Sequence, residues 1–127
     1  MATDLDGEYH RATESWDQLF RQLSASPRRR ILLALMKASP EEDVSLPDDI
    51  IVTDGPVDRE RMTIELCHHH LPSLAEDSYI EWETSPLTAR RGPRFHESEV
   101  VLRTLLDAHR EYPHSLWNDA VEQRVIR

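Results

Sequence analysis

The chain has 127 residues and a single cysteine, and its 15 basic residues against 24 acidic residues give a formal net charge of −9 at pH 7. This length suits one domain with one core, and a single cysteine excludes an intramolecular disulfide and any zinc site built on cysteine pairs. No apolar run approaches the roughly 18 residues that a membrane span needs, and the N-terminus is too polar for a signal sequence, so we expect a cytoplasmic protein without membrane association.

Arginine supplies nearly all of the positive charge, because Lys37 is the only lysine. An acid-rich composition with so little lysine resembles that of halophile proteins. At about 1 M salt the Debye length is about 3 Å, so a net negative charge repels a phosphate backbone only at contact range. The acidic total therefore does not exclude nucleic acid as a partner in a salt-rich cytoplasm, although in dilute buffer most of the counterion-release drive would be missing.

Two helices are predicted near the N-terminus, after a polar and flexible tail at residues 1–13. Within Glu14 to Ser24 the apolar residues recur with the spacing of an amphipathic helix, at Trp16, Leu19, Phe20 and Leu23. A second helix is predicted from Ser26 to about Ala38, because Ser26 is a favoured N-cap and Pro27 a favoured first helical residue. Its inward residues are Ile31, Leu32, Leu35 and Met36.

A loop and a long helix are predicted for the middle of the chain. Residues 40–57 contain three prolines and many acids, so at most one helical turn fits, near Pro47 to Ile51. Asp58 is a suitable cap for a helix that runs to about Glu76. The inward residues of this helix are Met62, Leu66, Leu74 and either His70 or Cys67. Pro72 removes a backbone hydrogen bond inside it, so we expect a kink or an interruption near residues 68–71.

A hairpin and a last helix complete the predicted elements. Tyr79 to Thr84 alternate apolar and acidic residues as a strand does, and a returning strand is predicted at Ala89 to Phe95. The intervening residues supply a turn, and Gly92 with Pro93 would end or bulge the hairpin. Glu97 to Glu111 have the apolar stripe of a helix that stops at Pro113, and residues 113–127 are predicted to be a tail or a short helix.

The order of these elements predicts an α+β fold of the winged helix-turn-helix class, with three to five helices and a two-stranded hairpin wing over residues 14–112. The segment LFRQLSASPRRRILLALM, residues 19–36, resembles the opening helices of ArsR-like winged-helix regulators, and HLPSLAEDSYIEW, residues 70–82, resembles the end of their recognition helix and their first wing strand. Together SPRRRILLAL, HHHLPSL, YIEW and RRGPRF resemble a winged-helix domain of unassigned function from halophilic archaea.

This resemblance implies a DNA-binding regulator of transcription that is often dimeric, but two departures stand out. The helix that normally precedes the recognition helix is shortened to SLPDDII, and its surroundings are acidic. Ser78 stands where such proteins commonly turn on glycine. The first departure removes an element that normally braces the recognition helix across the DNA backbone.

Two groups of residues are predicted to contact DNA. On the exposed face of the helix at residues 58–76, polar side chains suit base edges in the major groove, where arginine with guanine is the commonest specific pair; they are Arg59, Arg61, Thr63, His68 and His69. Arg90, Arg91 and Arg94 form a basic cluster that we place at the wing tip, where it suits the minor groove or flanking phosphates. The alternatives are a solvated helix face, and arginines paired with the surplus acids.

Other clusters have less specific meanings. The three arginines 28–30 open a helix against its dipole, which indicates either phosphate contact or intramolecular pairing. Cys67 and His70 share a helix with two more histidines, but no second ligand pair follows, so we predict a core role and no metal. The chain has only three glycines and lacks the phosphate-loop, nucleophile-elbow and HExxH motifs, so we expect neither enzyme activity nor a cofactor.

The sequence therefore predicts a sequence-specific transcriptional regulator that binds double-stranded DNA. The last helix and residues Leu116 and Trp117 carry more apolar surface than a small core needs, which favours a homodimer that includes the C-terminal segment. The alternative is a winged-helix protein interaction module without DNA binding. Acids crowded on the presumed DNA face would favour the module.

Overall fold

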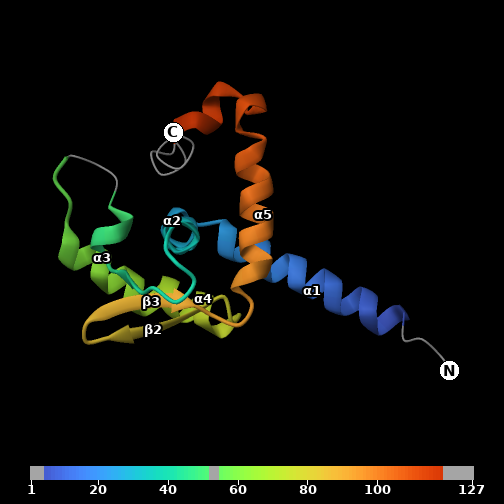
Figure 1. Ribbon diagram of the computed structural model, residues 1–127, viewed down its shortest axis with the longest axis horizontal. Helices are drawn as coiled ribbons and strands as arrows, with labels where there is room; N and C mark the ends of the chain where they lie inside the picture. Colours follow the sequence, from blue (N-terminus) through green and yellow to red (C-terminus); the bar gives the residue numbers. More distant parts are fainter. Residues whose placement is uncertain (1–4, 52–54, 119–127) are drawn as a thin grey trace.

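The computed structural model describes residues 5–51 and 55–118 as a mixed α+β fold with a small antiparallel sheet. Helix α1 spans Leu5–Leu23 and helix α2 spans Ser26–Lys37. Both predicted helices are confirmed, but the predicted start of the first was wrong, because it begins at Leu5 instead of Glu14. The predicted tail therefore belongs largely to a helix, which projects beyond the body of the molecule (Figure 1).

The core is centred on α2, whose side chains Ile31, Leu32, Leu33 and Leu35 are almost fully buried. The end of α1, the sheet and the later helices pack around it. Ser26 is the first helical residue of α2, and Ala25 occupies the N-cap position without a side-chain bond, so the predicted capping role of Ser26 was wrong. Pro27, which was predicted to be the first helical residue, is the second and still lies in the first turn.

The long helix is interrupted where proline demands it. It consists of α3 at Arg59–Glu65, a π-helical turn, η2, at Leu66–His70, and α4 at Leu71–Glu76. Pro72 has no N–H to donate to the carbonyl four residues before it, and its ring would crowd that carbonyl. The π turn relieves this conflict, with the N–H of Leu71 donating to the carbonyl of Leu66. The predicted interruption is therefore confirmed.

The sheet has the order β1-β3-β2, with β1 at Val44–Ser45, β2 at Ile80–Thr84 and β3 at Leu87–Arg91. The hairpin prediction is confirmed, but β3 begins and ends earlier than predicted, because Ser85 and Pro86 alone make the turn. Strand β1 was missed because it has only two residues. Its Val44 pairs with Ala89 of β3 and contributes to the core.

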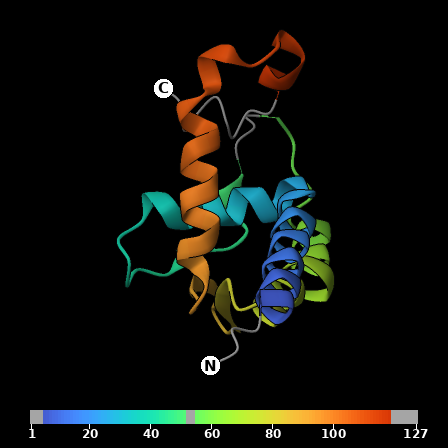
Figure 2. The same cartoon turned by 90° about the vertical axis from the view of Figure 1, so that its right-hand side faces the viewer.

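The remaining elements lie between and beyond the strands. One 3-10 turn, η1 at Asp48–Ile50, follows β1 and matches the single helical turn predicted there. Helix α5 spans Phe95–Asp107, so Phe95 belongs to this helix and not to a strand. The 3-10 turns η3 at His109–Glu111 and η4 at His114–Asn118 follow it. Figure 2 looks along α1 and shows α5 standing beside it.

The junction between α4 and β2 is closed by backbone contacts. Ser78 adopts a left-handed conformation with φ 65°, the N–H of Tyr79 donates to the Leu74 carbonyl at 3.0 Å, and that of Ser78 donates to the Ala75 carbonyl at 3.0 Å. This bond pattern ends the helix in a Schellman motif. Gly92 packs against the same turn, and its N–H donates to the Tyr79 carbonyl at 3.0 Å.

Gly92→Ala is predicted to destabilise the protein, because an added Cβ would lie 2.6 Å from the Ser78 carbonyl oxygen and 2.7 Å from the Ile80 nitrogen. Both are backbone atoms that cannot yield without moving the hairpin, so we expect a loss of at least about 2 kcal/mol in the free energy of unfolding. Urea unfolding monitored by circular dichroism measures it. Gly7→Ala, in the first turn of α1, is the control and should be neutral or stabilising. Equal stability of Gly92→Ala and the wild type would contradict the close packing.

Candidate nucleic-acid interface

The C-terminal part of the long helix is fixed to the core. The amide of Gln22, on α1, is 1 % exposed and donates to the Ser73 hydroxyl at 2.9 Å and to the Asp77 carboxylate at 2.7 Å. The Ser73 hydroxyl in turn donates to the Gln22 side-chain oxygen at 3.1 Å. Leu71 and Leu74 are fully buried beside this network. Helix α4 is therefore anchored by both polar and apolar contacts.

The N-terminal part of the long helix is presented to solvent, because none of the seven residues of α3 is buried. The Asp58 side chain caps the helix by accepting from the N–H of Arg61 at 3.0 Å. The Thr63 hydroxyl donates back to the Arg59 carbonyl at 2.8 Å, so this candidate contact residue is turned toward its own helix. The sequence-predicted exposed face of α3 is present in the structure.

The arginines of α3 differ in how firmly they are paired. Arg59 forms a short ion pair with Asp48 of η1, which raises the pKa of Arg59 and lowers that of Asp48, in both cases chiefly through the hydrogen bond between them. Arg61 lies 3.4 Å from Glu65, one turn later, and remains largely exposed. His68 and His69 are exposed on the π turn that follows. The surface that remains most open to a partner is therefore Arg61, His68 and His69.

The prediction that Arg90, Arg91 and Arg94 lie at the wing tip was wrong. Arg90 and Arg91 lie on β3 and Arg94 lies between β3 and α5, all at the end of the hairpin opposite its turn. The turn itself carries Ser85 and Pro86. At about 3.3 Å per residue, four steps along β3 place Arg91 about 13 Å from the first strand residue after the turn.

Each of these arginines has acceptors within the protein. Arg90 is paired with Asp43 at 3.0 Å, and this hydrogen bond raises the pKa of Arg90. Arg91 donates to the carbonyls of Leu35 at 2.9 Å and Ala38 at 3.2 Å. Its second guanidinium nitrogen lies 3.4 Å from Glu99. The predicted alternative of pairing with acids therefore describes Arg90, and Arg91 is a structural bridge between β3, α2 and α5.

Arg94 is the third structural arginine. Its guanidinium donates to the Glu97 carboxylate at 2.9 and 3.0 Å and to the Gln18 side-chain oxygen of α1 at 2.8 Å. The ion pair raises the pKa of Arg94 and lowers that of Glu97, mainly by the hydrogen bond. Its guanidinium carbon also lies 5.3 Å from the centre of the Tyr79 ring. These contacts join the junction after β3 to α1.

Arginines at the start of α2 are also turned inward. Arg28 donates to the carbonyls of Arg21 at 2.7 Å and Gln22 at 3.1 Å, and Arg29 donates to that of Leu23 at 2.7 Å. These are the last carbonyls of α1, which have no partners within their own helix. The predicted intramolecular alternative is therefore present for these two side chains, with backbone carbonyls as the acceptors.

His70 lies behind the exposed face and contacts Arg28, with 3.2 Å between its Nδ1 and the guanidinium. Burial, followed by the charge of Arg28, lowers the pKa of His70 from its ordinary value. Because guanidinium can only donate, Nδ1 accepts this bond in the neutral ring. Cys67 is half-buried, and across residues 5–51 and 55–118 no group of three or more His, Cys, Asp or Glu side chains is arranged to hold a metal ion.

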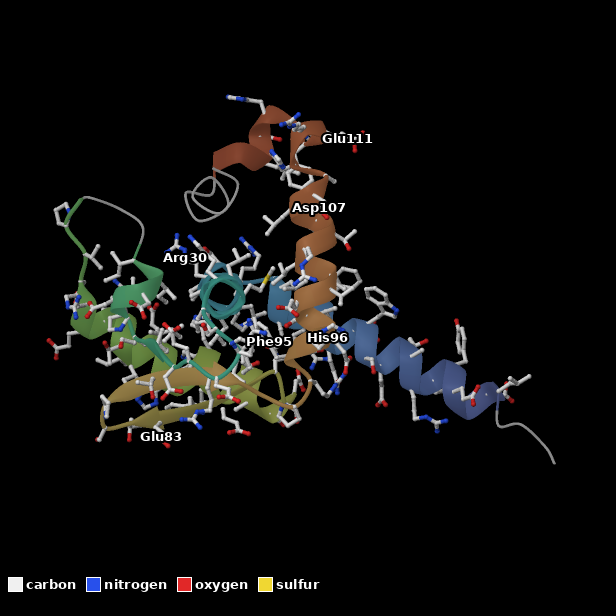
Figure 3. All side chains as sticks on the ribbon, viewed as in Figure 1. Arg30, Glu83, Phe95, His96, Asp107 and Glu111 are labelled. Atoms are coloured by element: carbon white, nitrogen blue, oxygen red, sulfur yellow. The ribbon has the colours of Figure 1, made fainter. Side chains whose placement is uncertain are left out.

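Acidic side chains lie on the outer strand of the hairpin, β2. Glu81 and Glu83 are exposed on β2, where they pair in register with Arg90 and Thr88. In Figure 3 Glu83 points away from the sheet into solvent. The hairpin surface is therefore acidic on β2 and partly neutralised by Arg90.

One exposed residue of α3 was missed by the sequence reasoning. Ile64 has 52 % of its surface exposed, on the same side as Arg61 and His68, which lie three residues before and four residues after it. The predicted DNA contacts on this helix were all polar side chains. The helical spacing from Arg61 was the signal that would have identified Ile64.

In comparisons with known proteins, no protein-family model, no curated protein and no solved structure matches this chain. The resemblance to winged-helix regulators therefore remains a prediction from the sequence. None of the helices in the described part of the chain is both long enough and apolar enough to cross a membrane.

Acidification is predicted to weaken the fold through His70. Its folded-state pKa lies below the ordinary 6.5, so the unfolded chain binds the proton more readily. The contribution of His70 to the free energy of unfolding should be constant well above pH 6.5. It should fall as the pH drops through 6.5, and it should stop falling below the folded-state pKa of His70. His70→Asn keeps an acceptor near Arg28 without a titrating ring, so the part of the loss due to His70 should disappear.

Urea midpoints at molar salt, measured at several pH values between 8 and 5, test this. His68→Asn is the matched control, because it removes an exposed imidazole from the same turn and should retain the wild-type pH dependence. An unchanged pH dependence in His70→Asn would exclude His70 as the origin.

Proposed function

We propose that this chain is a winged-helix regulator of transcription that binds double-stranded DNA through α3 and η2 in a salt-rich cytoplasm, as in halophilic archaea. The order of elements supports this proposal: α2, β1, the short η1, the long helix, and a hairpin whose second strand pairs with β1. In the winged-helix class this order places the long helix as the recognition element, with the hairpin as its wing.

The observation that carries the proposal is a helix that is anchored at one end and presented at the other. Helix α4 is held by Gln22 and the core, whereas α3 has no buried residue. Recognition helices contact base edges mainly with their N-terminal residues. The start of α3 and the hairpin turn lie on the same side of the molecule, at the left of Figure 1, so both could approach one duplex.

Arg61, His68 and His69 are the side chains to which we assign base and backbone contacts. Arg61 and the histidines are exposed, and a guanidinium suits the O6 and N7 atoms of guanine. Arg59 and Arg90 would have to exchange Asp48 and Asp43 for phosphate before contributing. We assign Arg91 and Arg94 a positioning role, because their guanidinium groups hold the hairpin to α2, α5 and α1.

The test is a selection from random duplex fragments at molar salt with the full chain, followed by titration of the enriched duplex. Substituting alanine for Arg61, His68 and His69 together should weaken binding about a hundredfold, since a good base contact contributes about 1–3 kcal/mol. The control replaces His10, Arg11 and His114, which removes the same side-chain types from exposed positions elsewhere. Equal losses for the two triple variants would contradict a specific interface on α3.

A protein interaction module without DNA binding is the second candidate, and the arrangement of acids favours it. Asp43 and Asp48 hold Arg90 and Arg59, and Glu81 and Glu83 lie exposed on β2. At contact range these carboxylates repel phosphate even in high salt. Failure of the selection to enrich any duplex, at any salt concentration, would favour the module over the regulator.

We also infer that the chain forms a homodimer, with the projecting face of α1 covered by a second copy. Apolar side chains follow α1 at alternating intervals of four and three residues, at Leu5, Tyr9, Ala12, Trp16, Leu19 and Leu23. This is the spacing of a helix that packs on a partner helix along a seam. Leu19 and Leu23 are buried in the chain's own core, but Leu5, Tyr9 and Trp16 are 67 %, 71 % and 50 % exposed.

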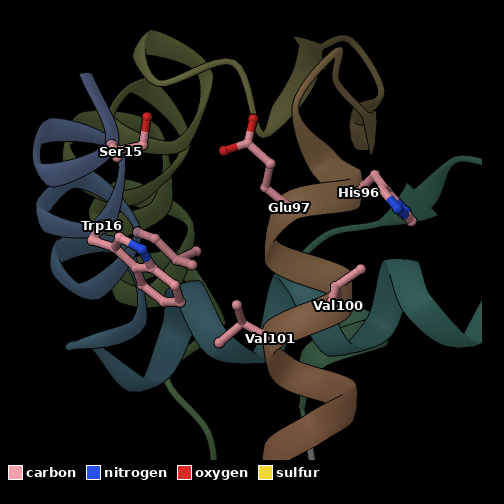
Figure 4. A pocket seen from close by; sticks show the side chains of 8 residues that line it. Ser15, Trp16, His96, Glu97, Val100 and Val101 are labelled. Carbon is pink, nitrogen blue, oxygen red and sulfur yellow. The ribbon is translucent and has the colours of Figure 1, made fainter. Parts of the chain in front are cut away.

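The exposed part of this seam continues into a groove between α1 and α5. The groove has a volume of about 420 Å³, and in Figure 4 Trp16 of α1 faces Val101 of α5 across it. Phe20 stacks on Trp16 with 5.6 Å between ring centres, and Val100 and Leu105 of α5 are also exposed. The exposed apolar side chains of α1 and the groove between α1 and α5 therefore lie side by side. A two-fold interface, in which each copy contributes the same surface, requires such an arrangement.

Replacing Tyr9 and Trp16 by glutamine is predicted to produce monomers. Each buried aromatic side chain contributes about 1.5–3 kcal/mol, and two-fold symmetry doubles the loss, so the dimer dissociation constant should rise at least about ten-thousandfold. Sedimentation equilibrium at molar salt measures the mass. Ile64→Gln, an exposed apolar residue on α3, is the control and should leave the dimer intact. A monomeric wild type would exclude the interface.

A further inference from the structure

Ile64 is the one large apolar side chain exposed on α3, and its place on the helix distinguishes it from a chance surface residue. Single exposed apolar residues are normal on proteins and need no explanation by themselves. Ile64, however, lies on a stripe between two polar residues of the candidate interface, Arg61 and His68. A β-branched residue at a solvated helical position also gains nothing from helix propensity.

The neighbours of Ile64 show that this exposure is fixed by the fold. Met62 packs partly against the core and Leu66 is 1 % exposed, so α3 cannot rotate Ile64 inward without exposing them. The hydroxyl of Thr63, the neighbouring residue that was also predicted to contact DNA, donates a hydrogen bond to the Arg59 carbonyl. Ile64 is therefore held outward beside Arg61.

We propose that Ile64 is a specificity-determining residue that contacts the C5-methyl group of a thymine in the major groove. This inference rests on the proposed function, since it requires α3 to enter DNA. The thymine methyl is the apolar group that a base pair presents in this groove, and apolar side chains recognise it. Arginine and isoleucine on one stripe therefore point to a site that combines a guanine with a thymine.

The helix geometry limits the distance between these two bases. Three residues of α-helix rise about 4.5 Å, and base pairs are stacked about 3.4 Å apart. A side chain three residues after Arg61 therefore meets a base within one or two pairs of the base that Arg61 contacts. Arg61 is free to turn toward this base, because its pairing with Glu65 is long, at 3.4 Å, and exposed.

A double-substitution experiment tests the contact between Ile64 and the methyl group. The probe is the duplex enriched by the wild-type chain, in which each thymine is replaced in turn by uracil, which lacks only the methyl. We expect one position, within one or two base pairs of a guanine, at which uracil weakens wild-type binding about fourfold, as burial of one methyl implies. Ile64→Ala should bind the two duplexes at that position equally well.

Leu116→Ala, which shortens an exposed apolar residue on η4, away from α3 and from the groove between α1 and α5, is the control and should keep the wild-type sensitivity to uracil. Circular dichroism shows whether Ile64→Ala is folded, and Ile64→Val, which keeps a branched side chain, should recover sensitivity to the methyl. Equal sensitivity in Ile64→Ala and the wild type, or no sensitive position at all, overturns this inference but leaves DNA binding intact. Failure to enrich any duplex overturns the proposed function together with it.

Discussion

Guanidinium groups that donate to carbonyl oxygens at helix ends hold the layers of this protein in register. Arg28 and Arg29 extend from the start of α2 to the last carbonyls of α1, and Arg91 extends from β3 to those at the end of α2. The final carbonyls of a helix lack partners within it and carry its negative partial charge, so a cation with several donors satisfies both needs. Arginine offers such donors in a planar fork, which lysine does not.

The same bonds explain why the arginines were hard to interpret from the sequence. Periodicity and proline placement are local, so they predicted the hairpin and the interruption before Pro72 well. The partner of Arg90 is Asp43 and that of Arg91 is the Leu35 carbonyl, each more than 40 positions away along the chain. No spacing rule reports such pairs. Arg90 and Arg91 therefore lie at the end of the hairpin opposite its turn, where Arg91 is mostly covered and Arg90 is exposed beside Asp43.

Other differences have equally physical reasons. A strand of two residues such as β1 is too short to show alternation, and its pairing is decided by β3. The first half of α1 was read as a tail because polar residues dominate it, whereas its sparse apolar seam becomes meaningful only once the helix is seen to project from the body (Figure 1). Ile64 was passed over because an apolar side chain is expected to be buried, and only the position of α3 shows that it is not.

The π turn at Leu66–His70 has a consequence for how this helix could diversify. A π turn contains one residue more than an α turn, so it acts as a single inserted residue and rotates the preceding helix by about 100° relative to the following one. The face that α3 offers to solvent is thereby decoupled from the face that α4 buries. Related chains that lost this extra residue would keep the anchor at Leu71 and Leu74 and yet present a different set of side chains outward.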